Sequence, residues 1–230
     1  MTPRVTPPRI TQTSSAAQAI EKLDLFAKAA IVIDVTTGEV LYSRNANAQL
    51  PLASLTKVPL ALAVSEALPD TTLITVPRNI PGTSHTSRLQ KGQQFTLRDF
   101  MSYMLLGSSN DAAQILSDYG NEPIRARYPA APEKSAIVWR MNVLAKDIGL
   151  SRTYFLNATG LDESGEQAGA YGSARDVATM FMYAAKEAPQ LFADTAAKNV
   201  TISALDTTKA TAENTDLALN TIPGLIMGKT

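Results

Sequence analysis

The chain has 230 residues, 45% hydrophobic and 18% charged, which is enough apolar material to bury a sizeable core and excludes wholesale disorder. Its 21 basic and 21 acidic residues cancel, and basic residues occur at most in isolated pairs. This balance argues against a nucleic-acid-binding protein that grips phosphates and against a polybasic membrane anchor.

The chain has no cysteine and one histidine. The absence of cysteine excludes disulfides and thiolate chemistry. Zinc hydrolases usually need two or three histidines, and this chain has one, so the sequence predicts no metal centre and no cofactor. A Ser-His-Asp triad would depend on His85 alone, which lies in the loop 81–85 and is interpreted as a surface residue.

The sequence contains no membrane-spanning or secretory segment. No apolar stretch reaches the length of about 20 residues that a transmembrane helix needs. Residues 1–8 lack the apolar core of a signal peptide. Any export signal or membrane anchor is therefore expected outside the sequence given.

The N-terminal part differs in composition from the rest. Residues 1–15 are rich in Pro, Thr and Ser and predict an extended arm, and residues 16–26 predict a short helix with Ser15 as its cap. The prediction is thus a flexible arm and short helix over residues 1–27, followed by one domain over residues 28–230.

That domain is predicted to open with a β-hairpin and then a helix that carries a polar motif. Apolar, β-branched runs at 29–35 and 40–43 flank turn residues, which is the pattern of a hairpin. Ser54 and Lys57 form the chain's only Ser-x-x-Lys, where the apolar run 58–68 should start a helix. Pro59 would fall in the second turn of that helix, which predicts a distorted start.

The Ser-x-x-Lys spacing has a chemical use. At a helix start it puts the hydroxyl of Ser54 and the amine of Lys57 on one face, within hydrogen-bonding reach. The helix N-terminus adds a positive partial charge that favours a developing alkoxide. A lysine acts as a base only when burial or a neighbouring cation lowers its pKa. Under that condition the pair supplies a nucleophile and its activator without histidine.

The middle of the chain predicts two helices that meet at a corner. A strand is expected at 72–76, then a helix that begins at Thr96 and stops at Gly107, then a helix over 110–119. The polar corner between the two helices is Ser108-Ser109-Asn110. The remaining predicted elements are a helix at 141–148 closed by Gly149, a loop at 151–165, a helix capped by Ser173 with Asp176 at its third position, and a short strand at 200–202.

Three polar motifs follow one another in a fixed order: Ser54-x-x-Lys57, Ser108-x-Asn110 and Lys229-Thr230. This is the motif set of the penicillin-recognising serine acyltransferases. The flanking sequence, from about residue 28 to 230, more narrowly resembles the low-molecular-weight D-alanyl-D-alanine carboxypeptidases. The segments that carry the resemblance are 33–42, 50–57, 96–99, 105–113, 157–161 and 173–176.

The resemblance implies an α/β (α+β) fold, with an antiparallel sheet, a helical subdomain and the active site between them. In it Ser54 would attack an amide carbonyl and form an acyl-enzyme, and neutral Lys57 would take the serine proton. Ser108 would relay a proton to the leaving nitrogen. Lys229 would be the cation that depresses the pKa of Lys57.

Substrate binding is expected at the remaining motif positions. Asn110 suits the amide backbone of the substrate, while Lys229 and the hydroxyl of Thr230 suit the free carboxylate of a C-terminal D-alanine. The implied partners are the D-Ala-D-Ala end of a peptidoglycan stem peptide and, as inhibitors, β-lactams. That substrate implies an extracytoplasmic setting, in the periplasm or cell envelope. The Asn157 loop and Asp176 are interpreted as structural residues that shape the site.

The end of the sequence cuts the family's third motif, Lys-Thr-Gly, because it stops at Thr230. The resemblance therefore implies that C-terminal strands and one of two oxyanion donors are missing, the other being the backbone N–H of Ser54. The expectation is that these 230 residues alone are unstable or inactive, with an unpaired strand edge.

Three other functions stay open. A DD-endopeptidase would use the same acyl-enzyme and differ in its groove. A class A β-lactamase would need a glutamate in a Glu-x-x-Leu-Asn loop, and Glu133, Glu163 and Glu166 lack that context. An inactive module that binds cell-wall peptides would keep its affinity without Ser54.

Overall fold

The structure, a computed structural model, describes residues 25–79, 88–219 and 221–230. The predicted arm, most of the helix predicted at 16–26 and His85 lie outside these ranges. The helices are η1 (Ala53–Thr56), α2 (Lys57–Ala67), α3 (Leu97–Gly107), α4 (Asn110–Arg127), α5 (Ala136–Asp147), α6 (Ala174–Glu187) and η2 (Pro189–Ala196). The strands are β1 (Ala30–Ile33), β2 (Val40–Arg44), β3 (Leu50–Pro51), β4 (Leu73–Thr75), β5 (Gln94–Thr96), β6 (Tyr154–Phe155), β7 (Ala170–Gly172), β8 (Asn199–Ser203) and β9 (Lys209–Glu213).

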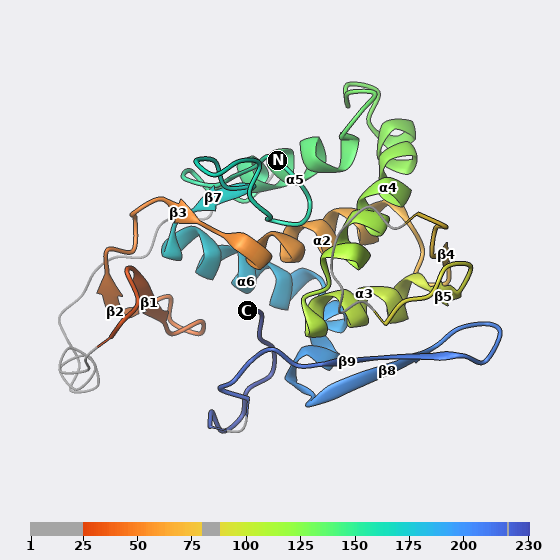
Figure 1. Ribbon diagram of the computed structural model, residues 1–230. Coiled ribbons are helices and arrows are strands. Elements are labelled where there is room, and N and C mark those ends of the chain that lie inside the picture. The colour runs from red at the N-terminus through yellow and green to blue at the C-terminus, as the bar shows by residue number, and fades with distance from the viewer. Residues whose placement is uncertain (1–24, 80–87, 220) are drawn as a thin grey trace.

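Helix α2 lies at the centre of the molecule, and α3, α4, α5 and α6 pack around it (Figure 1). Its residues 57–64 are all buried. Apart from Lys57 this stretch is apolar on every side, which is the pattern of a helix enclosed by other helices. The core is therefore built around a helix whose first residue is an ionisable side chain.

The start of this helix explains how Pro59 is accommodated. The four residues Ala53–Thr56 form a 3₁₀ helix, and the α-helix begins only at Lys57. Pro59 thus lies in the first turn of α2, where the backbone nitrogen has no intrahelical acceptor to lose. The predicted distortion at the helix start is confirmed, and the placement of Pro59 in the second turn is wrong.

Hydroxyl side chains cap three of the other helices, and two of these caps, Thr96 and Ser173, are the predicted ones. Thr96 Oγ1 accepts from the backbone N–H of Asp99 at 3.2 Å and starts α3. Ser173 Oγ accepts from the N–H of Asp176 at 3.1 Å and starts α6. Ser109 Oγ accepts from the N–H of Ala112 at 3.2 Å and starts α4 immediately after the corner. These caps fix where α4 begins and hence where its first side chains point.

Several elements have other bounds than predicted. Helix α4 continues to Arg127 instead of ending near 119, and it carries Pro123 within it. A Cβ on Gly120 would lie 2.8 Å from Ile137 Cδ1 of α5, so this glycine allows close helix packing and does not end the helix. Helix α5 begins at Ala136 and not at 141, because its first turn is also buried. The strand predicted at 200–202 is longer, and its partner β9 was not predicted.

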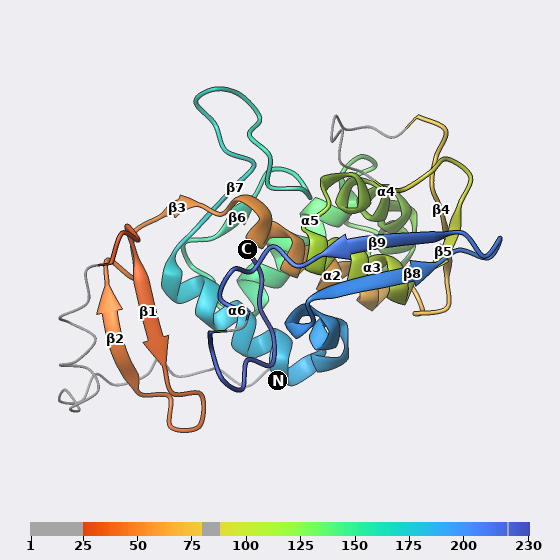
Figure 2. The same ribbon diagram turned by 60° about the horizontal axis from the view of Figure 1, so that its bottom comes forward.

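All strand pairs are antiparallel, as expected for this fold class. Among the described residues they form four small sheets: β1–β2, β3–β7–β6, β4–β5 and β8–β9. The predicted hairpin β1–β2 is confirmed, with Ala30 opposite Arg44. It lies at one end of the molecule, and β8–β9 crosses α3 at the other (Figure 2). The two hairpins are separate two-stranded sheets and do not pair with each other.

None of the helices in the described ranges is both long enough and apolar enough to cross a bilayer.

Candidate active site

Ser54 and Lys57 lie one turn apart at the junction of η1 and α2. Lys57 Nζ donates to Ser54 Oγ at 2.9 Å, which confirms the predicted contact between hydroxyl and amine. Ala53, immediately before the serine, has a φ of 46°, in the left-handed region that side chains other than glycine rarely adopt. This unusual turn leads from β3 into η1, and it leaves Ser54 half-buried at the surface of a cleft.

Lys57 is buried completely and its ammonium nitrogen has three acceptors. Besides Ser54 Oγ, Nζ donates to Asn110 Oδ1 at 2.7 Å and to the backbone oxygen of Thr159 at 2.9 Å. Asn110 is the first residue of α4, so the Ser109 cap helps to hold its amide in place. The three contacts fix the nitrogen of Lys57 beside the serine oxygen.

The buried position changes the acidity of both lysines of the site. Burial, and secondly the positive charge of Lys229, lower the pKa of Lys57 from 10.5 to about 7. Burial also lowers the pKa of Lys229, from 10.5 to about 8. Near neutral pH a large fraction of Lys57 is therefore an uncharged amine, while most of Lys229 remains an ammonium. The charge of Lys229 acts on the pKa of Lys57 in the predicted direction, although burial is the larger cause.

Ser108 and Lys229 form the second pair of the site. Lys229 Nζ donates to Ser108 Oγ at 2.8 Å, and Ser108 Oγ lies 3.3 Å from the backbone oxygen of Thr230. Ser108 ends α3 in a left-handed conformation with a φ of 55°. The tight corner between α3 and α4 thus presents Ser108 and Asn110 on either side of one turn.

These groups line one cleft with a volume of about 500 Å³. Figure 1 shows the C-terminal end of the chain lying beside the orange segment that leads into α2, and Figure 2 shows the same from a second side. The lining residues are Leu52, Ala53, Ser54, Leu55, Ser108, Thr215, Lys229 and Thr230. Lys57 joins this set through its hydrogen bond to Ser54, and Asn110 joins it through its hydrogen bond to Lys57. All six site residues predicted from the sequence are therefore brought together.

A comparison with protein families agrees with this arrangement. The family model described as D-alanyl-D-alanine carboxypeptidase, peptidase family S11, matches residues 12–230. The chain belongs to this family.

Two individual relatives in this carboxypeptidase family share about a third of their residues with the chain over the matched regions. D-alanyl-D-alanine carboxypeptidase DacF of Bacillus subtilis is 32% identical over 161 residues, which cover 67% of this chain and 38% of DacF. A D-alanyl-D-alanine endopeptidase of Pseudomonas aeruginosa is 33% identical over 141 residues, which cover 60% of this chain and 42% of that protein. The chain therefore spans less than half the length of these two curated relatives.

A solved structure shows the same fold. Penicillin-binding protein D2 of Listeria monocytogenes, in its ampicillin-bound form, superposes with a TM-score of 0.72 at 30% sequence identity. The match covers 91% of this chain and 80% of that one. The α+β class predicted from the sequence is confirmed by this likeness.

The loop 157–161 of the chain also contributes to the site, in a way that was not predicted in full. Asn157 Oδ1 accepts from the backbone N–H of Thr159 at 3.1 Å and of Gly160 at 2.7 Å. The resulting turn aims the carbonyl of Thr159 at Lys57. The structural role predicted for the Asn157 loop is confirmed. The direct contact by Thr159 was missed because a backbone carbonyl leaves no signature in residue type.

Gly160 is the position of this loop least able to accept a side chain. Its φ is 79°, and a Cβ there would lie 1.9 Å from the backbone oxygen of Ala53 and 2.8 Å from Thr56 Oγ1. We expect Gly160→Ala to push the loop away from η1, to lower the free energy of unfolding by about 2–4 kcal/mol and to slow any acylation of Ser54. Thermal melts and acylation rates measure both effects.

Gly165→Ala is the matched control, because a Cβ there meets nothing within 4 Å. Equal melting temperatures for the two variants would contradict the close approach of the loop to η1.

Asp176 and the three glutamates considered for a β-lactamase have other surroundings. Asp176 Oδ2 accepts from the backbone N–H of Arg152 and from Thr153 Oγ1, both at 2.8 Å, which confirms its structural role. The glutamates Glu133, Glu163 and Glu166 are all exposed. Glu163 accepts from Asn157 Nδ2 at 2.6 Å and so belongs to the loop described above.

Proposed function

We propose that this chain acts as a serine DD-carboxypeptidase, which removes the terminal D-alanine from peptidoglycan stem peptides through an acyl-enzyme at Ser54. The observation that carries the proposal is the Ser54–Lys57 pair: a buried amine with a pKa of about 7, 2.9 Å from a hydroxyl on a cleft. A base whose pKa lies near the working pH is the most effective kind. Membership of the carboxypeptidase family supports the proposal independently.

Acylation would use the two hydrogen-bonded pairs in turn. Ser54 Oγ attacks the carbonyl carbon of the penultimate D-alanine while neutral Lys57 takes the hydroxyl proton. The backbone N–H of Ser54 donates to the oxyanion of the tetrahedral intermediate. When the C–N bond breaks, Ser108 Oγ passes its proton to the departing nitrogen and takes up the proton that Lys57 received from Ser54, so Lys57 is neutral again before deacylation. Ser108 Oγ also accepts from the ammonium of Lys229 at 2.8 Å. The products are free D-alanine and an ester on Ser54.

Deacylation would reverse the roles with water as the nucleophile. Water loses a proton to the lysine base as its oxygen adds to the ester carbonyl. The ester C–O bond then breaks, Ser54 regains its proton, and the shortened peptide leaves with a new carboxylate. One peptide bond and one water molecule are consumed in each cycle.

Substrate binding would follow the remaining polar atoms of the site. Because Asn110 Oδ1 accepts from Lys57, its Nδ2 is the atom that would donate to a substrate carbonyl. The ammonium of Lys229 and the hydroxyl of Thr230 offer a cation and a donor to the carboxylate of the terminal D-alanine. β-Lactams would acylate the same serine, and a peptidoglycan substrate implies a reaction outside the cytoplasm, in the cell envelope.

DD-endopeptidase activity is the second candidate, because a relative of similar identity carries that name. The two activities share the acyl-enzyme and differ in the group that the penultimate D-alanine carries on its C-terminal side. The proposal is tested on the chain and on a longer form of it that completes the Lys-Thr-Gly motif. Each is incubated with an N-acetylated peptide that ends in D-Ala-D-Ala, with a cross-linked dimer of that peptide, and with a chromogenic cephalosporin.

Release of D-alanine from the linear peptide alone supports the carboxypeptidase. Cleavage of the dimer in preference to the linear peptide would replace it by the endopeptidase. Rapid turnover of the cephalosporin would replace it by a β-lactamase, and reversible peptide binding without any turnover would replace it by a binding module.

The acylation rate should depend on pH in two steps. Lys57 must be neutral to accept the proton, so the rate falls by about tenfold per pH unit below its pKa of about 7. Lys229 must be charged, so the rate falls again above its pKa of about 8. We expect a narrow bell-shaped profile of kcat/KM with its maximum between these values. A rate that stays constant from about pH 5.5 to 7 would contradict the role of Lys57 as base.

A further inference from the structure

Thr215 is a cleft residue that belongs to none of the three motifs. It comes shortly after β9 in the sequence, is exposed, and lines the cleft together with Ser54 and Lys229. Its Oγ1 lies 2.5 Å from Thr230 Oγ1, so the two hydroxyls share one hydrogen bond. The cleft therefore has a hydroxyl pair where the motif pattern indicates a single hydroxyl.

The backbone next to Thr215 is held by its neighbour Asn214. The Asn214 side chain donates to the backbone oxygens of Thr195 and Ala197, both at 2.7 Å. Its Oδ1 accepts from the N–H of Asp216 at 2.9 Å, and its own N–H donates to Lys198 O at 2.9 Å. The segment is thus tied to the connection between η2 and β8, and the hydroxyl of Thr215 is not needed to hold it.

The motif segment is tied to the same anchor. Thr195, which is buried, accepts the backbone N–H of Gly228 at 3.1 Å through its Oγ1. A Cβ on Gly228 would lie 2.8 Å from Asp216 Oδ2, so the two segments are in close contact. The distance between the Thr215 and Thr230 hydroxyls is therefore set by the fold and not by the freedom of two loops.

The chemistry of this corner fits an anion with two oxygens. When one of the two hydroxyls donates to the other, the proton of the accepting hydroxyl stays free to donate to a ligand. The ammonium of Lys229 belongs to the residue next to Thr230. A carboxylate can accept from both hydroxyls at once if the shared hydrogen bond opens, and a hydrogen bond to a charged acceptor is stronger than one between hydroxyls. The carbonyl of a continuing amide carries no net charge and gains less from the exchange.

We propose that Thr215 is a specificity-determining residue, whose hydroxyl completes the carboxylate site with Thr230 and favours substrates that end at the terminal D-alanine over substrates that continue. The inference rests on the proposed function, since it assumes that the cleft receives a D-Ala-D-Ala peptide.

The test compares Thr215→Val and Thr215→Ser on an N-acetylated D-Ala-D-Ala peptide and on the C-terminal amide of the same peptide. We expect Thr215→Val to lower kcat/KM for the carboxylate about tenfold, mainly through KM, and to leave the amide unchanged. Thr215→Ser should restore the carboxylate value. The matched control is Thr211→Val, because Thr211 forms a similar hydroxyl pair with Thr201, 2.9 Å apart, on the hairpin β8–β9.

Three outcomes would overturn the inference while leaving the proposed function intact. They are wild-type kinetics for Thr215→Val, an equal loss on both peptides, and a serine variant as impaired as the valine variant. Failure of the proposed function has a separate sign: the unaltered chain would then neither release D-alanine nor form an adduct with benzylpenicillin, and the inference would fall with it.

Discussion

Ser54→Ala is expected to abolish the covalent adduct that the unaltered chain forms with benzylpenicillin. The only hydroxyl within hydrogen-bonding distance of Lys57 Nζ, among the described residues, is that of Ser54. Alanine removes the attacking oxygen and adds no bulk, so the fold and the cleft should persist. Intact-mass measurement after incubation with the β-lactam reads the result directly.

Ser203→Ala is the matched control for that experiment. Ser203 is an exposed serine of β8 and does not line the cleft. This variant should form the adduct as the unaltered chain does. An adduct that persists in Ser54→Ala would show that another residue is the nucleophile.

Lys57→Met is expected to slow acylation by about 10²- to 10⁴-fold, the range that removal of a general base usually costs. Methionine is close to lysine in length and apolar, so it fills the buried space but accepts no proton. The measurement is the second-order rate constant for adduct formation near pH 7.5. Unaltered acylation would contradict the proposed base.

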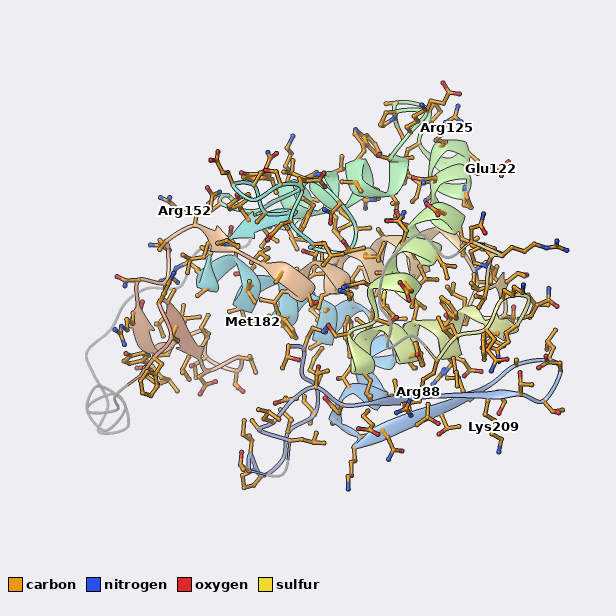
Figure 3. The ribbon with its side chains drawn as sticks, viewed as in Figure 1. Arg88, Glu122, Arg125, Arg152, Met182 and Lys209 are labelled. Carbon is orange, nitrogen blue, oxygen red and sulfur yellow. The ribbon has the colours of Figure 1, made fainter. Side chains whose placement is uncertain are left out.

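Lys209→Met serves as the control, because Lys209 is exposed and lies on β9 toward the far end of the hairpin, well away from the C-terminal end of the chain (Figure 3). The Lys209→Met variant removes an amine from the surface in place of the buried one and should leave the acylation rate unchanged.

Lys57→Met also gives a test that does not need activity, because it changes how the stability of the chain depends on pH. The pKa of Lys57 is about 7 in the folded chain against an ordinary value of 10.5. Between these values the unfolded chain binds the extra proton, so the free energy of unfolding should rise with pH across that window. Lys57→Met removes this contribution, whereas that of Lys229 is common to both proteins. The stability of the unaltered chain relative to the variant should therefore increase from about pH 7.5 to about pH 9.5.

Side-chain chemistry made part of the site predictable. Ser54 and Lys57 could be paired from their spacing because a helical turn brings positions three apart together. Thr96 and Ser173 could be placed as caps because a hydroxyl ahead of an acidic third residue favours a helix start. Each of these signals is local, and the structure preserves it.

The parts that were missed depend on packing between distant segments. The carbonyl of Thr159 reaches Lys57 only because Gly160 lets the loop approach Ala53, and nothing in the residue types near Lys57 indicates that. Helix α4 passes Gly120 because α5 packs against it there. Thr215 meets Thr230 through an anchor in η2, which no motif spacing reveals.

The strand pairing was also set by contacts that sequence patterns do not encode. Strand β9 has the short, alternating pattern KATAE, which buries Ala210 and Ala212 against α3. Alanine is a weak indicator of strands, so this half of the hairpin carried little signal. A Cβ on Gly107 would lie 2.7 Å from the Ala212 side chain, and small residues on both sides allow this close packing.

We expect Ser54, activated by Lys57, to form an acyl-enzyme. Peptide mapping of the unaltered chain after reaction with benzylpenicillin tests this, because fragmentation identifies the modified residue. We expect one modification, on Ser54, which appears faster at about pH 7.5 than at about pH 5.5. A modification on Ser108 or elsewhere, or a folded chain that binds the β-lactam without any covalent bond, would contradict it.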